Sequence, residues 1–154
     1  MTPMEQRKCQ TDNEKVLDEL LKASRILADE TYQVPPQIMW VDNSTIATLG
    51  NFSASTGKAK SRKTFNVSAI VAASLGKKQV LKYKACLPEG KRKILYIDTE
   101  QSRYHCHGVM RRILRLAGMQ QDVNAANLVF YGLREYHPTM RLQLIERALE
   151  QEQG

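Results

Sequence analysis

The first apolar pattern of the chain predicts a helix near the N-terminus. Apolar residues recur three or four positions apart and form one stripe, which is typical of an amphipathic helix. Thr11 and Glu14 have capping-box spacing ahead of this stripe, and Pro35-Pro36 is expected to end the helix because proline lacks a backbone N–H. We therefore expect an N-terminal helical arm over residues 1–34 and a separate domain over residues 35–154. The stripe consists of Val16, Leu17, Leu20, Leu21 and Leu27.

Beyond residue 45, short β-favouring runs alternate with helical patterns. Leu49–Thr56 predicts a first strand, Ile94–Ile97 a buried second strand, and Leu128–Tyr131 a third. This alternation favours an α/β fold built on a parallel sheet. The connection over residues 77–93 shows no regular pattern, so we expect an irregular loop there.

Three further helices are predicted between and after these strands. Gly76 and Gly118 stand where the first two should stop, as glycine often does just past a helix, and Pro138 suits the first turn of the last one. Because a further strand should follow, we expect the 154 residues to form the N-terminal part of the domain. The expected apolar faces are Val67, Ile70, Val71 and Ser74, then Cys106, Val109, Ile113 and Leu116, then Leu142, Ile145 and Leu149.

Composition and cysteine usage point to a cytoplasmic globular protein. Hydrophobic residues make up 42% of the 154 residues, enough for one core of ordinary size. The longest nearly uncharged stretch, Ile46–Gly57, is too short and too polar to cross a bilayer. Three widely spaced cysteines fit reduced thiols. His105, Cys106 and His107 are neighbours on one helix and cannot converge on one metal ion, so we expect a buried cysteine between two solvated histidines.

Positive charge is concentrated in the middle of the chain. The net charge is +7, and residues 57–115 hold 15 basic and 3 acidic groups, whereas residues 1–36 hold 5 basic and 7 acidic groups. The basic region is therefore the candidate for contact with phosphate, whether of a nucleotide or of a nucleic acid.

The segment Gly57–Thr64 reads GKAKSRKT and matches most of a P-loop. In this motif, backbone N–H groups of the loop and of the following helix surround a phosphate. Gly57 would turn the chain, Lys63 would neutralise phosphate and support catalysis, and Thr64 would bind Mg²⁺. Arg62 stands where the motif has glycine, and its side chain has to point away from the loop. A solvated basic surface loop is the alternative. The candidate nucleotide-binding residues are Gly57, Lys58, Ala59, Lys60, Ser61, Arg62, Lys63 and Thr64.

Two carboxylates follow the predicted strand Ile94–Ile97. Ligands of parallel sheets lie beyond the carboxyl ends of the strands, so Asp98 and Glu100 would face the same crevice as the loop. Glu100 could accept a proton from an attacking water, and Asp98 could order Mg²⁺ through water. The alternative is an ordinary acidic strand end that caps the next helix.

These elements together resemble a known superfamily. A strand, a GxxxxxKT loop, a helix and a strand reading LYIDTEQS are similar to the RecA-like P-loop ATPases, and more closely to the RepA-type and KaiC-type ATPases of plasmids and mobile elements. The resemblance extends over roughly residues 35 to 150. It implies a RecA-like fold, ATP and Mg²⁺ as cofactors, Glu100 as the catalytic base, and ATP-driven work in DNA replication or mobilisation.

The same resemblance implies parts that would lie after the last predicted helix. They are the Walker B aspartate, the DNA-contacting loops and a residue donated by a neighbouring subunit of a homo-oligomer. We therefore expect this chain to bind ATP but to hydrolyse it poorly. The alternative is a basic α/β nucleic-acid-binding or regulatory module with a degenerate P-loop and no ATPase activity.

The basic connection over residues 77–93 is a candidate contact for a DNA backbone. One aromatic residue, Tyr83, stands among its basic residues, and a solvated surface insertion is the alternative. The basic residues are Lys77, Lys78, Lys82, Lys84, Lys91, Arg92 and Lys93.

Overall fold

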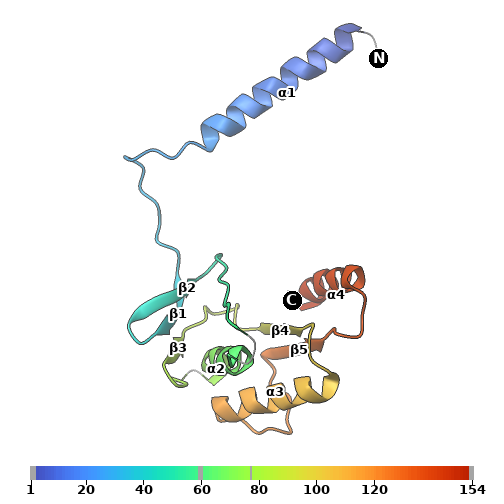
Figure 1. The fold of residues 1–154 in the computed structure, drawn as a ribbon. Coiled ribbons are helices and arrows are strands. Elements are labelled where there is room, and N and C mark those ends of the chain that lie inside the picture. The colour runs from blue at the N-terminus through green and yellow to red at the C-terminus, as the bar shows by residue number, and fades with distance from the viewer. Residues whose placement is uncertain (1–2, 59–60, 77, 153–154) are drawn as a thin grey trace. The chain divides into compact units, whose positions relative to one another are not determined.

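The computed structural model describes residues 3–58, 61–76 and 78–152, with side chains from residue 13 onward. The chain divides into two units, Met1–Val34 and Pro35–Gly154. The first contains one helix, α1, over Pro3–Ala23 (Figure 1). Within the described residues, no helix combines the length and apolar character needed to cross a membrane.

The predicted bounds of the N-terminal helix were wrong at both ends. Thr11 and Glu14 lie inside α1, because proline suits a first helical position and the helix begins at Pro3. The helix ends at Ala23 rather than at Pro35-Pro36. The next residue, Ser24, still donates its backbone N–H to the Leu20 carbonyl over 2.9 Å, and its hydroxyl donates to the same oxygen over 2.7 Å. The stripe from Val16 to Leu21 is exposed.

An antiparallel sheet that the sequence did not predict opens the second unit. Strands β1 (Gln37–Val41) and β2 (Ser44–Thr48) form a hairpin, and β3 (Tyr83–Ala85) pairs with the other edge of β1. Asp42 turns the hairpin with a φ of 51°, which aspartate tolerates better than most residues. The predicted strand Leu49–Thr56 is absent, because a turn at Gly50, with a φ of 83°, ends the pairing.

A two-stranded parallel sheet follows. Strands β4 (Ile94–Asp98) and β5 (Leu128–Gly132) pair from Ile94 opposite Leu128 to Asp98 opposite Gly132. Both strands confirm the sequence prediction. The expected parallel sheet of three strands was wrong, because the predicted strand Leu49–Thr56 does not form and β3, inside the basic connection, joins the antiparallel sheet.

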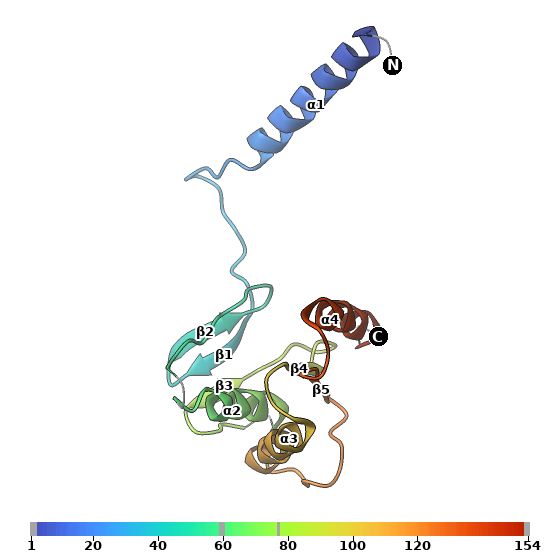
Figure 2. The ribbon, with the colours of Figure 1, turned by 45° about the vertical axis from the view of Figure 1, so that its right-hand side comes forward.

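The core lies between the sheets and two helices, α2 (Lys63–Gly76) and α3 (Arg103–Ala117), which lie side by side in Figures 1 and 2. Small residues of α2 let the helices approach closely, and Ile113 and Leu114 of α3 are fully enclosed. The predicted apolar face of α3 is confirmed. So is its stop at Gly118, which has a φ of 75°. The small residues of α2 are Ser68, Ala69, Ala72 and Ala73.

The last helix, α4 (Pro138–Glu152), begins where the sequence predicted but buries a different face. Leu142 and Leu149 are 64% and 46% exposed, whereas Ala148 is buried. A 3.1 Å ion pair between Lys93 and Glu152 ties the end of α4 to the segment before β4. α4 therefore packs through Ala148 and is held by the ion pair between Lys93 and Glu152, whereas the predicted leucines remain exposed.

Gly76 provides a test of the contact between α2 and α3. A Cβ at Gly76 would lie 2.9 Å from the carbonyl oxygen of Ala117, a backbone atom that cannot move aside alone. We expect Gly76→Ala to lower the free energy of unfolding by about 1–3 kcal/mol, as overpacking does, measured by urea denaturation.

Gly108 of α3 is the matched control for this substitution. A Cβ there meets nothing within 4 Å. Gly108→Ala should raise stability by about 0.5–1 kcal/mol, because alanine loses less backbone entropy in a helix. Equal effects of the two substitutions would contradict the close approach of the helices.

Candidate functional site

The predicted phosphate loop leads directly into α2. Lys63 is the first residue of the helix and Thr64 lies in its first turn. Residues 51–56, which precede the loop, form no strand. Ala59 and Lys60 lie outside the described residues. The structure therefore retains the junction of loop and helix that the motif requires, without the strand that was expected to lead into it.

The side chain of Lys63 folds back over its own loop. Its ammonium group donates to the carbonyl of Gly57 over 2.7 Å and to that of Lys58 over 3.2 Å. The backbone N–H of Ser61 also donates to the Lys58 carbonyl. A Cβ at Gly57 would lie 2.7 Å from Ser61 Oγ, so the loop closes tightly at this position. The lysine thus sits on the inner side of a closed turn and bonds to neutral oxygens.

Arg62 takes the backbone conformation of a glycine at the position where the motif has one. Its φ is 60°, and its carbonyl accepts the N–H of Asn66 in the first turn of α2. For a residue with a Cβ this conformation costs about 1 kcal/mol or more. Its side chain is exposed. The backbone at Arg62 is therefore in the left-handed region, which glycine adopts without this cost.

The two carboxylates after β4 have different surroundings. Asp98 is 8% exposed and accepts three hydrogen bonds, from the N–H groups of Glu100 and Gln101 and from the Gln101 side chain, over 2.7–2.9 Å. These bonds fix the turn that leads into α3. Glu100 is exposed, and among the described residues its carboxylate has no hydrogen-bond partner. In the same part of the chain, no hydrogen bond or ion pair joins either carboxylate to Lys63.

The segment His105–His107 has a buried cysteine between two exposed histidines, as predicted. Cys106 is buried, with Sγ 3.6 Å from the carbonyl of Gln101, and both histidines are exposed. His105 Nδ1 lies 2.8 Å from the hydroxyl of Ser102. No three acidic, histidine or cysteine side chains within the described residues gather as metal ligands.

Burial and the nearby charge of Asp98 raise the pKa of two side chains, Tyr96 and Cys106. Desolvation raises the pKa of Tyr96, and the negative charge of Asp98 raises it further. The same two causes, in the same order, raise the pKa of the Cys106 thiol. Tyr96 also stacks on Phe130, with ring centroids 4.3 Å apart. Both groups therefore stay neutral at physiological pH and belong to the core.

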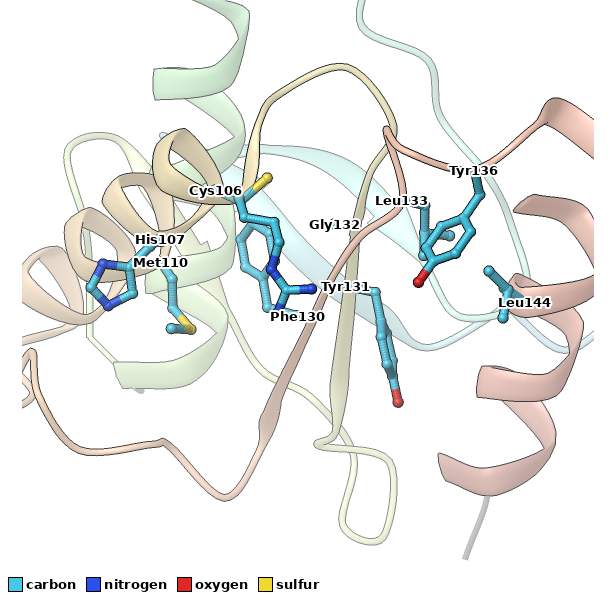
Figure 3. Close-up of a pocket in the computed structure, with 10 residues that line it drawn as sticks. Cys106, His107, Met110, Phe130, Tyr131, Gly132, Leu133, Tyr136 and Leu144 are labelled. Atoms are coloured by element: carbon cyan, nitrogen blue, oxygen red, sulfur yellow. The ribbon is translucent and has the colours of Figure 1, made fainter. Parts of the chain in front are cut away.

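A pocket of about 550 Å³ lies along β5 and between α3 and α4 (Figure 3). Tyr131, Tyr136 and Leu144 stand on one side of the view, and His107 and Met110 on the other. None of the predicted site residues lines it. No sequence motif marks this pocket, because its walls come from three separate elements. The cluster of aromatic residues from Phe130 to Tyr136 is the feature of the sequence that could have indicated it. The remaining lining residues are Arg103, Cys106, Gly132 and Leu133.

Comparison with known proteins gives no relative to draw on. No protein-family model matches the sequence, and neither the curated proteins nor the solved structures contain a significant match.

Tyr96 makes the stability of the fold sensitive to alkaline pH. Because its pKa is raised above the ordinary value of 10.0, the folded state favours the neutral phenol. This contribution to stability is complete below pH 10 and is lost as the pH rises through the raised pKa. We expect Tyr96→Phe to reduce the loss of stability between neutral pH and about pH 11, measured by urea denaturation at both values.

Tyr104→Phe serves as the control, because Tyr104 is 83% exposed. This variant should show the same alkaline loss as the unmodified chain. A Tyr96→Phe variant that loses as much stability as the control would contradict the assignment of the alkaline effect to Tyr96.

Proposed function

We propose that this chain binds ATP with Mg²⁺ through Gly57–Thr64, as a P-loop domain of the RecA-like type. The start of α2 at Lys63 is the observation that supports this best. The first N–H groups of a helix have no partner within it and favour an anion. Lys63 and Thr64 both lie in this first turn, where the motif uses a lysine for phosphate and a hydroxyl for Mg²⁺.

ATP binding would exchange the partners of Lys63. In the closed loop, its ammonium group bonds to two neutral carbonyls. A charged phosphate oxygen is the stronger acceptor, because charge-assisted hydrogen bonds have roughly twice the strength of neutral ones. The lysine would therefore leave the carbonyls of Gly57 and Lys58 for the β- and γ-phosphates, and the loop would open around them.

Hydrolysis is proposed to be slow in this chain. Glu100 is exposed and is the candidate base, and a general base supplies about a hundred- to ten-thousandfold of the rate. Asp98 is the candidate for ordering Mg²⁺ through water, but its oxygens already accept three bonds within a turn. Binding without appreciable turnover follows from this arrangement.

The wider role rests on the sequence resemblance. Because the resemblance is to RepA-type and KaiC-type ATPases of plasmids and mobile elements, we propose ATP-driven work in DNA replication or mobilisation for this protein, acting as a homo-oligomer. The second candidate is a basic nucleic-acid-binding or regulatory module without turnover. The observation that favours it is the closed loop, in which Lys63 is engaged and Arg62 replaces glycine.

The proposed ATP site is tested by calorimetry with Mg²⁺ present. We expect ATP to bind at micromolar to low millimolar concentration and Lys63→Ala to abolish measurable binding, because it removes the charge that neutralises phosphate.

Lys91→Ala is the charge-matched control, since Lys91 is exposed and lies outside the loop. It should bind ATP as the unmodified chain does. Phosphate release should stay at background at saturating ATP. Equal ATP affinity in the Lys63→Ala and Lys91→Ala variants would overturn the proposal.

Arg62 provides a second test, in which two substitutions remove the same side-chain charge. Arg62→Gly also relieves the backbone at φ 60°, whereas Arg62→Ala keeps the strain. We expect the glycine variant to be more stable than the alanine variant by roughly 1 kcal/mol and to bind ATP more tightly. Denaturation and calorimetry measure the two effects. Indistinguishable variants would show that the backbone conformation of this position is unimportant for the loop.

A further inference from the structure

The antiparallel sheet has one covered face and one open face. Paired residues of neighbouring antiparallel strands lie on the same face. Met39 pairs with Ala85 and is buried, and Val41 pairs with Tyr83, which packs on the core and donates its hydroxyl to Asn66 of α2 over 2.6 Å. This face is the one that α2 covers (Figure 2). Tyr83, the aromatic residue of the basic connection, therefore lies on the face toward α2.

The opposite face places Trp40 among basic side chains. Trp40 pairs with Lys84 on β3 and with Thr45 on β2, so these three share the open face. Trp40 is half-buried, while Lys84 and Thr45 are exposed. The strand β3 thus brings the basic connection beside an aromatic residue that lies more than forty positions earlier in the chain.

The indole of Trp40 is held in place from its polar edge. Its Nε1–H donates to Gln37 Oε1 over 3.2 Å, and the hydroxyl of Thr45 donates to the same oxygen over 2.9 Å. A ring fixed in this way loses little further freedom when a ligand stacks on it.

A hollow of about 390 Å³ lies at the Trp40 ring, lined by Trp40, Lys78, Gln79, Lys84, Ala85 and Cys86. A second hollow of about 230 Å³ shares Ala85 and Cys86 with it and reaches Arg92. We call the two together the Trp40 groove. Neither hollow is lined by a carboxylate. Elsewhere in the connection, Lys82 is paired with Asp42 and Lys93 with Glu152, whereas Lys84 and Arg92 line the groove.

We propose that the Trp40 groove binds single-stranded nucleic acid. One base would stack on the indole of Trp40, and the phosphates on either side of it would contact Lys84 and Arg92. An exposed aromatic face beside lysines suits a single strand, because every unpaired base offers a face for stacking while its backbone needs cations. Paired bases of a duplex are already stacked and cannot offer a face to the ring. The groove lies apart from Gly57–Thr64, so this proposal holds even if the loop binds no ATP.

The proposal is tested with the full chain and oligonucleotides of fifteen thymidines or fifteen uridines at low salt, unlabelled for tryptophan emission and fluorescein-labelled for affinity. Trp40 is the single tryptophan of the chain, so its emission reports stacking directly. We expect binding to quench this emission, and a fifteen-base-pair duplex to leave it unchanged. Quenching by either single strand supports the proposal, and the tighter of the two identifies the preferred sugar.

Substitutions at two residues, Trp40 and Lys84, separate the contribution of stacking to affinity from that of charge. Trp40→Ala should weaken binding by about 5- to 150-fold, the range measured for loss of one stacked base, and Trp40→Phe should recover most of it. Lys84→Ala should weaken binding and reduce the slope of log affinity against log salt by about 0.7 for one lost phosphate contact on a single strand.

Lys22→Ala, on α1, is the control for a lost charge, and thermal unfolding followed by circular dichroism checks that each variant folds. Unquenched Trp40 emission at saturation, or a Lys84→Ala affinity equal to that of Lys22→Ala, would overturn the proposal. So would a duplex that quenches as strongly as the single strands.

Discussion

The close contact between α2 and α3 determines where both predicted chemical regions lie. The phosphate loop opens α2, and the turn built on Asp98 opens α3. The two helices can approach because α2 presents alanines and, at its end, Gly76 to the backbone of Ala117. A larger residue in this contact would separate the helices and move the loop relative to the parallel strands. The packing of small residues is therefore the constraint on which any joint action of Lys63 and Glu100 depends.

Some of the candidate side chains are engaged in hydrogen bonds within the protein, and others are exposed and available to a ligand. Lys63 is held by loop carbonyls and Asp98 by its own turn, so each must give up bonds before it meets a ligand. Lys84 and Glu100 are exposed and need no such exchange. Engaged groups are pre-positioned but cost energy to redirect, whereas exposed groups are free to move but lose entropy on binding. Binding at the proposed nucleotide loop should therefore cost the energy of redirecting hydrogen bonds, whereas binding in the Trp40 groove should cost mainly side-chain entropy.

The sequence predicted those elements whose stability is local or strongly patterned. The strands at Ile94 and Leu128 are continuous apolar runs, and α3 has a regular apolar face with a glycine stop, so their positions were correct. The hairpin at Gln37–Thr48 was missed because its turn, the short Asp42-Asn43 pair, lacks the glycine that marks many two-residue hairpin turns. Strand β3 was missed because its three residues are specified by pairing with β1, which is remote in sequence. The leucines of α4 were assigned to the core from periodicity alone, which cannot show what the helix packs against.

The placement of the single tryptophan has a consequence for cooperativity. Trp40 belongs to the antiparallel sheet, whereas α3, β4 and β5 form the other side of the core. Emission from Trp40 therefore follows the melting of one sheet, while far-ultraviolet circular dichroism follows mainly the helices. Coincident transitions by the two probes would mean that Pro35–Gly154 unfolds as one two-state unit. Separate transitions would mean that the hairpin opens as a subdomain of its own, with a local stability below that of the helices.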